Sequence, residues 1–218
     1  MRWSRGIAYA VGLITTDGSL SIDGRHINLT SKDLDQIQTF IKILNLKNKI
    51  GLKYSSYTHE KKYYQVQFGN VKFYRFLLSI GLTPHKTKTL GSIKIPDRYF
   101  ADFLRGHLDG DGYTYSYWDK RWKSSFMMYT GFLSASENHI EWLQKEIKRF
   151  FGLSGAIKFE GKSTFSLKFA KRESLILVGK MYYNKKVPCL KRKYFKIQAC
   201  LDIISKQAEV GKLVYPLP

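Results

Sequence analysis

The feature that most constrains this chain is a nine-residue pattern that occurs twice, 94 residues apart. The first copy reads Ala-Val-Gly-Leu-Ile-Thr-Thr-Asp-Gly at 10–18, and the second reads Leu-Arg-Gly-His-Leu-Asp-Gly-Asp-Gly at 104–112. Asp17 and Asp111 hold the same place in the two copies. Two copies at this distance in a chain of 218 residues predict two similar halves. We place these halves at residues 1–92 and 93–218.

Each copy carries two small residues four positions apart, which a helix would place on one face. The pairs are Gly12 with Thr16, and Gly106 with Gly110. Small residues allow helices to pack backbone to backbone, which would bring Asp17 and Asp111 together. Adjacent carboxylates are costly unless a divalent cation lies between them, so the sequence predicts a Mg²⁺ or Mn²⁺ site. The alternative is a structural helix with a glycine cap and a solvated acid.

Both copies resemble the signature of the LAGLIDADG homing endonucleases, in the single-chain form with two motifs. The agreement lies in the first glycine and the final Asp-Gly of each copy. The resemblance implies an α+β fold of two αββαββα repeats related by a pseudo-twofold axis. The two motif helices would pack at the centre, and two antiparallel sheets would form a saddle for DNA. The implied enzyme is a monomer that makes metal-dependent double-strand breaks across the minor groove at a specific site, leaving 3′ overhangs.

The charge balance indicates a polyanionic partner. The chain has 37 Lys and Arg against 17 Asp and Glu, a net charge of +20, and a folded domain with this excess typically binds nucleic acid. Cys189 and Cys200 are too few for a zinc site or a disulfide framework. The sequence shows no apolar run of about 18 residues and no secretory signal. We therefore expect a protein of the cytoplasm or an organellar matrix, neither secreted nor inserted in a membrane.

The spacing of apolar residues predicts the order of the helices and hairpins. The expected helices are 7–16, 31–44, 71–80, 98–110, 136–151, 172–181 and 194–207. The expected hairpins are 19–30, 50–68, 113–134 and 157–169. In the third hairpin the register is ambiguous, since Phe132 points outward if Leu133 points inward. In the fourth, Ile157 and Phe159 are expected to face the core.

One face of each hairpin is polar and poor in carboxylates, which suits base edges and phosphates. A strand of about nine residues spans roughly nine base pairs, so two halves would cover on the order of twenty base pairs of double-stranded DNA. The expected DNA contacts of the first half are Ser19, Ser21, Asp23, Arg25, His26, Asn28, Thr30, Lys32, Lys53, Ser55, Tyr63, Gln65 and Gln67. Those of the second half are Tyr113, Tyr115, Tyr117, Lys120, Arg121, Lys123, Lys158, Glu160, Thr164, Ser166, Lys168, Lys191 and Arg192.

The resemblance also assigns the chemistry. Asp17 and Asp111 would hold metal, and a lysine shortly before the last helix of each half would stabilise the charge that develops on the phosphate. The matching lysines are Lys86 and Lys193. Lys191 and Arg192 are close rivals for the second role. The alternative role for all of these basic residues is phosphate contact without catalysis.

The resemblance suggests roles at two further positions, and a comparison of the two motifs suggests one for Asp109. The family often places a polar residue beside the metal at the end of the second strand, and the matching positions here are Ser31 and Ala135. Ala135 cannot order a water by hydrogen bonding, so Ser136 or a water is expected to substitute for it. Asp109 precedes Asp111 by two positions and is expected to cap or pack its helix rather than to bind metal.

Two other functions share this fold. An RNA maturase would use it to help an intron splice, and a DNA-binding protein could have lost cleavage. The presence of both Asp17 and Asp111 favours the enzyme over the inactive binder. No intein splicing residues flank the motifs, which favours a free-standing or intron-encoded endonuclease.

Overall fold

The computed structural model describes residues 1–54, 62–122 and 125–214, with the backbone alone at 62 and 208–214. The first half contains α1 (Arg5–Thr16), β1 (Gly18–Leu20), β2 (His26–Ser31), α2 (Leu34–Leu44), β3 (Gly51–Tyr54), β4 (Lys62–Gly69) and α3 (Val71–Ser79). The second half contains the 3-10 turn η1 (Asp97–Tyr99), α4 (Phe100–Asp109), β5 (Gly112–Trp118), β6 (Phe126–Ser134), α5 (Glu137–Phe151), β7 (Ala156–Gly161), β8 (Thr164–Phe169), α6 (Lys171–Met181) and α7 (Lys191–Val214).

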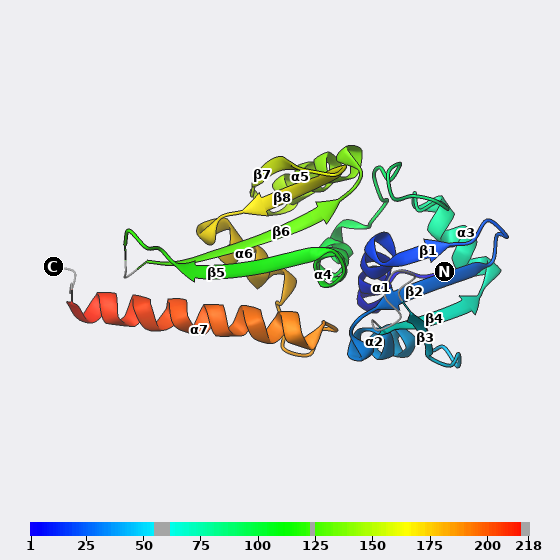
Figure 1. The fold of residues 1–218 in the computed structure, drawn as a ribbon, viewed down its shortest axis with the longest axis horizontal. Helices are drawn as coiled ribbons and strands as arrows, with labels where there is room; N and C mark the ends of the chain where they lie inside the picture. Colours follow the sequence, from blue (N-terminus) through cyan, green and yellow to red (C-terminus); the bar gives the residue numbers. More distant parts are fainter. Residues whose placement is uncertain (55–61, 123–124, 215–218) are drawn as a thin grey trace.

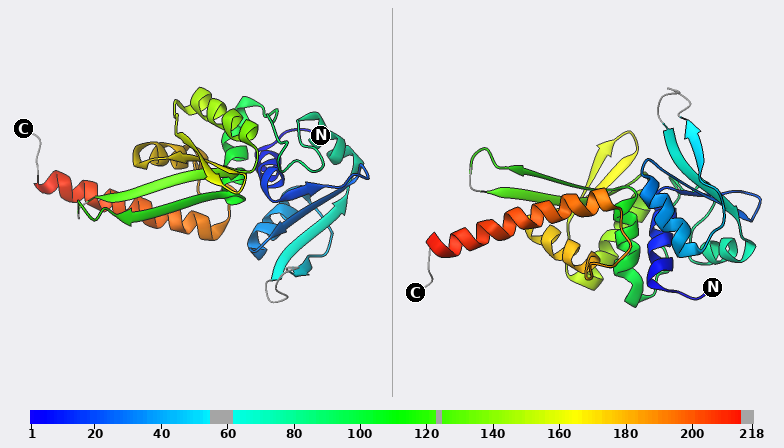
Figure 2. Two further views of the ribbon diagram at one scale, coloured as in Figure 1. Left: turned by 45° about the horizontal axis from the view of Figure 1, so that its top comes forward. Right: turned by 90° about the horizontal axis from the view of Figure 1, so that it is seen from below.

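Each half contains one four-stranded antiparallel sheet (Figure 1). The strand order is β1-β2-β4-β3 in the first sheet and β5-β6-β8-β7 in the second, so the two sheets have the same topology. Figure 2 shows the sheets on one side of the molecule and the helices on the other. The α+β fold of two αββαββα units that the sequence predicts is confirmed, and α7 follows the second unit.

The motif helices α1 and α4 pack against each other at the centre through glycines. A Cβ atom at Gly12 would lie 2.3 Å from the carbonyl oxygen of Phe103, and one at Gly106 would lie 2.1 Å from that of Tyr9. Neither distance is possible for a real side chain, so glycine is what allows the two backbones to come this close. The C-terminal ends of α1 and α4 therefore lie side by side.

A buried arginine ties α4 to the segment that leads into α7. The guanidinium of Arg105 is fully buried and pairs with Asp102 at 2.6 Å. It also donates to the carbonyl oxygens of Met181 and Pro188. The final helix, α7, is longer than the expected 194–207, since it spans Lys191–Val214. It runs beneath β5 (Figure 1). Neither α7 nor any other helix of the described residues is long and apolar enough to cross a membrane.

The second sheet settles the register that the sequence leaves ambiguous and corrects one expected orientation. Phe132 is fully buried on the core side, and Leu133 lies beside Ser166 on the outer face. The expectation that Phe159 faces the core is wrong, because its side chain is 56% exposed. It lies on edge strand β7, where the pairing with β8 shifts register between Phe159 and Gly161.

Candidate active site

Asp17 and Asp111 meet at the adjacent ends of α1 and α4. Asp17 caps α1, Asp111 follows α4 by two residues, and both line a pocket of about 410 Å³. Burial and the charge of Asp111 raise the pKa of Asp17 to about 7. Asp111 is exposed to solvent when the whole residue is considered. Its carboxyl group nevertheless lies among protein atoms, and this desolvation raises its pKa. The charge of Asp111 thus disfavours the ionisation of Asp17. A Cβ atom at Gly110, the residue before Asp111, would lie 3.1 Å from the Asp17 carboxylate, so the two acids lie close together.

Lys86 lies beside this acid pair. It follows α3 through a turn in which His85 has a positive φ of 54°, and its side chain is 6% exposed. Its ammonium donates to the carbonyl oxygen of Gly18, the residue after Asp17. Burial lowers the pKa of Lys86 to about 8, although the charges of Asp111 and Asp17 oppose this shift. The ammonium is therefore within electrostatic reach of both acids.

Lys193 closes the end of α4. Its ammonium lies 2.7–2.9 Å from the backbone carbonyl oxygens of Leu108, Asp109, Gly110 and Gly112. The last carbonyls of a helix have no partner within the helix and carry partial negative charge, so an ammonium satisfies them well. Burial lowers the pKa of Lys193 to about 8, against the charge of Asp109. Lys193 thus fixes the turn that carries Asp111.

Asp109 holds helices together behind the pocket. It is 1% exposed and accepts hydrogen bonds from the Tyr9 hydroxyl at 2.8 Å and from the Leu190 backbone N–H at 2.7 Å. Burial raises the pKa of Asp109 to about 6, while these two hydrogen bonds oppose the shift. The carboxylate therefore links α1, α4 and the start of α7, which agrees with the packing role that the sequence suggests.

The residues that end the second strand of each half are both serines. Ser31 accepts a hydrogen bond from the Asp33 backbone N–H at 3.1 Å, and Ser134 accepts one from the Ser136 backbone N–H at 3.0 Å. Asp33 and Ser136 are themselves the residues that precede α2 and α5. The expected counterpart of Ser31, Ala135, is therefore wrong by one residue. The error arises because the longer β5–β6 hairpin hides the register of β6 in the sequence.

Gln36, on α2, is a pocket residue that the sequence analysis missed. It is 2% exposed and lines the same pocket as both acids. The Ser31 hydroxyl donates to its side-chain carbonyl oxygen. The available signal was an uncharged polar residue next to Ile37 in the otherwise apolar stripe of this helix.

Comparison with solved structures gives the fold, although no protein-family model and no curated protein matches. Full-length DUF199/WhiA from Thermatoga maritima superposes with a TM-score of 0.61 at 15% identity, over 95% of this chain and 62% of that one. The LAGLIDADG homing endonuclease I-GzeII with its DNA target gives 0.60 at 14% identity, over 94% and 92% of the two chains. I-DmoI with DNA and Mn gives 0.54 at 19% identity, over 83% and 98%. The chain has the LAGLIDADG fold. It spans less than two thirds of full-length WhiA.

The outer face of the first LAGLIDADG sheet is polar. Two rows of side chains cross it: Ser19, Asn28 and Gln67 form one, and Thr30 and Gln65 form the other. On the opposite face of β4, Val66 is fully buried and Phe68 is 4% exposed. The glutamines therefore point away from the core, as the alternation in the sequence predicts.

The turn between β1 and β2 is shaped by an acid. Asp23 accepts hydrogen bonds from the backbone N–H groups of Arg25 and His26 and pairs with the His26 ring. The Asp23 carboxylate is therefore engaged in stabilising the turn. Ser21 and Arg25, which were also expected to contact DNA, are exposed to solvent.

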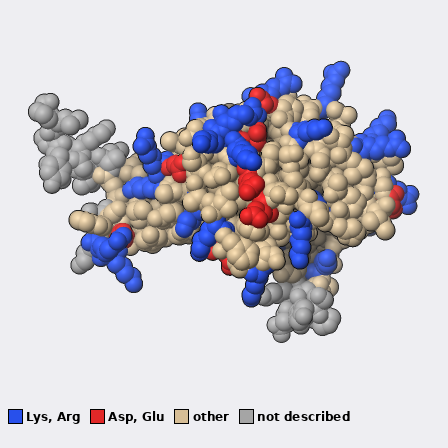
Figure 3. Space-filling model, turned by 90° about the horizontal axis from the view of Figure 1, so that it is seen from above, with Lys and Arg blue, Asp and Glu red and all other residues tan. Residues whose placement is uncertain are grey.

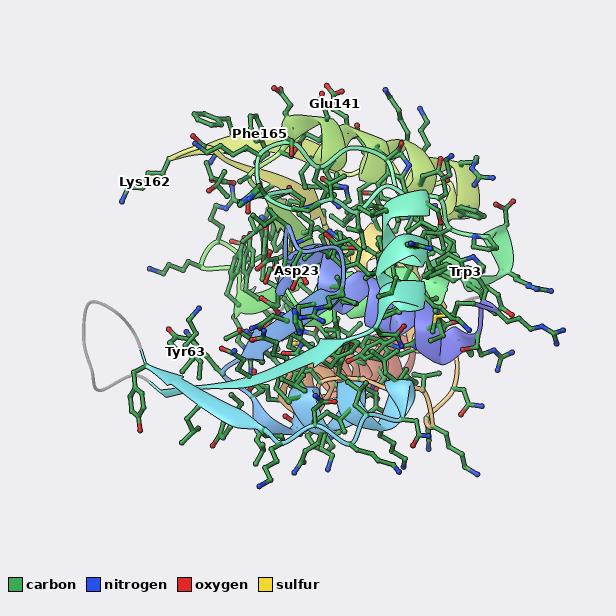
Figure 4. The ribbon with its side chains drawn as sticks, turned by 90° about the vertical axis from the view of Figure 1, so that its right-hand side faces the viewer. Trp3, Asp23, Tyr63, Glu141, Lys162 and Phe165 are labelled. Atoms are coloured by element: carbon green, nitrogen blue, oxygen red, sulfur yellow. The ribbon has the colours of Figure 1, made fainter. Side chains whose placement is uncertain are left out.

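Basic and aromatic side chains lie together near the outer end of the β3–β4 hairpin. Lys53 is paired with Tyr63 across the strands, and the ammonium of Lys32 lies 6.0 Å from the centre of the Tyr63 ring. Ser55 lies outside the described residues. Figure 4 shows that this hairpin, marked by Tyr63, and the β7–β8 hairpin, marked by Lys162, project to the same side of the molecule.

The second LAGLIDADG sheet presents stacked tyrosines instead of amides. The rings of Tyr115 and Tyr129 stack with centroids 4.9 Å apart, and Tyr113 and Tyr117 extend the stack along β5 at 6.0 and 6.3 Å from Tyr115. The Lys168 ammonium lies 5.5 Å from the Tyr129 ring centre. A ring that is stacked on both sides offers its edge and hydroxyl to a partner. Tyr129 was not among the expected contacts.

The remaining polar residues of this face are partly engaged with one another. Glu160 accepts hydrogen bonds from Lys158 at 3.0 Å and from Ser166 at 2.7 Å. Ser166 lies on the outer face as expected but is only 1% exposed. Thr164 is half-buried.

On the face seen in Figure 3, basic residues are widespread, and many of the visible acids lie in a band across the middle, with a few elsewhere. At the β5–β6 turn, Lys120 is exposed and Arg121 pairs with Asp119, while Lys123 lies outside the described residues. On α7, the exposed Lys191 precedes Arg192, whose guanidinium pairs at 2.8 Å with an acid that precedes α2. That ion pair links the two halves beside the pocket.

Proposed function

We propose that this chain is a metal-dependent endonuclease that cuts both strands of a specific DNA site and leaves 3′ overhangs. The observation that carries the proposal is the pair of Asp17 and Asp111, held together between two sheets whose outer faces carry polar and aromatic side chains. The structural relatives I-GzeII and I-DmoI, homing endonucleases solved with DNA, support it.

The donors present suit Mg²⁺ or Mn²⁺. Mg²⁺ prefers oxygen ligands and usually binds through one or two carboxylates together with water and substrate phosphates. The raised pKa values of Asp17 and Asp111 indicate a place where positive charge would stabilise the ionised pair. No group of three or more His, Cys, Asp or Glu that could hold a metal exists among the described residues, so a DNA phosphate would complete the coordination. The I-DmoI complex with Mn agrees with this choice.

Each residue near the pair has a distinct role in this proposal. Asp17 and Asp111 would hold the cation, whose chemistry would be to activate a water and to stabilise the leaving 3′ oxygen. Lys86 would add positive charge near the phosphate. Lys193 keeps the turn after α4 in place, because its N–H groups are engaged by backbone carbonyls.

The partner in this proposal is a duplex of on the order of twenty base pairs, bound by one copy of the chain. The first sheet would read base edges with its amide and hydroxyl groups. A second pocket, of about 300 Å³, is lined by Arg192, Lys193 and Lys196 beside Tyr113 and would hold a backbone phosphate. A free-standing or intron-encoded origin is part of the same proposal.

The similarity to WhiA supports a second candidate, a DNA-binding protein without cleavage. The two candidates differ in what the acid pair does. In an inactive binder, nothing requires Asp17 and Asp111 to stay ionised against mutual repulsion, whereas a nuclease needs both. RNA binding, the maturase function, is a third candidate, and a comparison of binding to structured intron RNA and to a selected DNA duplex detects it.

The test compares cleavage with binding. A target is first selected from random duplexes with the double variant Asp17→Asn/Asp111→Asn, and supercoiled plasmid carrying it is then incubated with Mg²⁺. We expect the wild type to linearise the plasmid and either single variant to lose double-strand cleavage while binding nearly as well. Glu141→Gln, at an exposed acid on α5 (Figure 4), is the control and should cut normally.

Full cutting by either Asp variant contradicts the assignment of the site. Binding by the wild type without any cutting favours the inactive binder. Tighter binding to structured intron RNA than to the selected duplex favours the maturase.

A further inference from the structure

A buried amide in the pocket has an unused donor. Asp33 donates its backbone N–H to the Ser31 oxygen at 3.1 Å, so the Ser31 proton is free to go to the carbonyl oxygen of Gln36. This pair of bonds fixes the orientation of the amide and leaves its Nε2 group with both protons. Within residues 1–54, 62–122 and 125–214, Nε2 has no hydrogen-bond partner. Buried donors are rarely left unpaired, and an exception calls for a ligand or an ordered water.

The surroundings of this amide indicate which ligand it takes. Gln36 lines the same 410 Å³ pocket as Asp17 and Asp111, and Lys32 and Arg192 line it as well. The lining of this pocket therefore combines a buried amide and two basic side chains with carboxylates. A phosphate group fits this combination, because its oxygens accept from the amide and can share a cation with the acids.

At the position equivalent to Gln36, the second half has a histidine instead of a free amide. His139 takes the place of Gln36, since each lies three residues after the residue that precedes its helix. The His139 Nδ1 donates to the Gly91 carbonyl oxygen at 2.8 Å, and its Nε2 lies 3.0 Å from the Nε2 of His107. The His139 ring is thus fully engaged within the protein, and it does not line the pocket.

We propose that Gln36 binds a phosphate of one DNA strand in the active site and makes the two strand cuts unequal in rate. The two halves share an acid, a lysine and a strand-end serine, but at this position the first half has a free amide and the second a histidine. This inference rests on the proposed function. It adds a residue to the site and predicts that one strand depends on that residue.

The test measures the cutting of each strand separately, on a selected duplex labelled differently on its two strands and saturated with enzyme. Gln36→Met keeps the size of the side chain and removes the donor. We expect the cutting of one strand to slow about tenfold, the cutting of the other to change less than about twofold, and nicked DNA to accumulate. Gln38→Met, at an exposed position of the same helix, should leave both rates unchanged.

A second variant guards against a loss of folding. Ser31→Ala leaves Gln36 in place but frees its amide to rotate, so it should slow the same strand by a smaller factor. Equal slowing of both strands by Gln36→Met, or no slowing, overturns the inference while the nuclease assignment stands. A wild type that cuts neither strand overturns the proposed function and this role together.

Discussion

Burial shifts the pKa values of the ionisable groups in the pocket towards the neutral forms, and only neighbouring charges of opposite sign oppose this shift. The pKa of Asp17 rises to about 7, and those of Lys86 and Lys193 fall to about 8. The repeated motif singled out Asp17, and the family resemblance pointed to the two lysines, because both depend on patterns along the chain. Neither could reveal Gln36, whose role depends on a hydrogen bond from β2 to α2.

The raised pKa of Asp17 predicts how stability varies with pH. Its folded pKa, about 7, lies above its unfolded value, 3.8, so the folded state favours the protonated carboxyl. This contribution is complete below about pH 4 and is lost as the pH rises to about 7. Without metal, Asp17→Asn should therefore be more stable than the wild type by about 1–3 kcal/mol at pH 8 and similar to it near pH 4.

Urea denaturation of both proteins with EDTA measures this difference, and repeating it with Mg²⁺ should reduce it. Glu141→Gln, which removes an exposed acid, should show no such pH dependence. A constant difference between the proteins from pH 4 to pH 8 contradicts the assigned pKa.

The alternation of apolar and polar residues correctly predicts which side chains face the core where that orientation depends on one strand alone. In β4 the alternation of Val66 and Phe68 with glutamines holds. It fails at Phe159, because the register shift between β7 and β8 is a property of two strands. The sequence predicts DNA contacts at Tyr113, Tyr115 and Tyr117 but no stack of rings. Tyr129 comes from β6 and meets Tyr115 through cross-strand pairing, which the pattern of one strand does not reveal.

The close contact of α1 with α4 predicts how much stability is lost when one methyl group is added between the two helices. Gly12→Ala places a carbon against the Phe103 carbonyl, which cannot move away without separating the helices. We expect a loss of about 2–3 kcal/mol in the free energy of unfolding, and slower cleavage because the acids move apart. Gly179→Ala in α6 is the matched control, since its Cβ would meet nothing within 4 Å; it should stabilise by about 0.5–1 kcal/mol. Equal effects of the two substitutions in chemical denaturation contradict the packing.

The two LAGLIDADG halves share a topology but present unlike surfaces. The first sheet carries amides and hydroxyls, and the second carries a stack of tyrosines. Comparison of the two motif copies predicts the shared topology, because a repeated motif indicates two halves with the same order of helices and strands. It does not predict the different surfaces, which depend on residues that the repeat leaves free.

The charge of +20 predicts a steep dependence of DNA affinity on salt. If about ten phosphates are contacted, log K should fall with log salt at a slope of about −9. Lys53→Ala should reduce the slope by about one. Gln65→Ala or Gln67→Ala should leave the slope unchanged and relax the preference at one or two base pairs, at a cost of about 1–3 kcal/mol on the best target. Titrations at several salt concentrations measure this; a wild-type slope near −2 argues against a long duplex interface.

The four carbonyl oxygens around the Lys193 ammonium form a cage of the kind that often recruits a dissolved potassium or sodium ion. The occupancy of such a cage by a free ion rises and falls with the composition of the medium. Here the cation is tethered covalently, so its local concentration is constant. We therefore expect the turn that carries Asp111 to keep its shape over a wide range of ionic strength. If the chain binds DNA as proposed, salt would change how often it binds, while the geometry of the acids would not depend on salt.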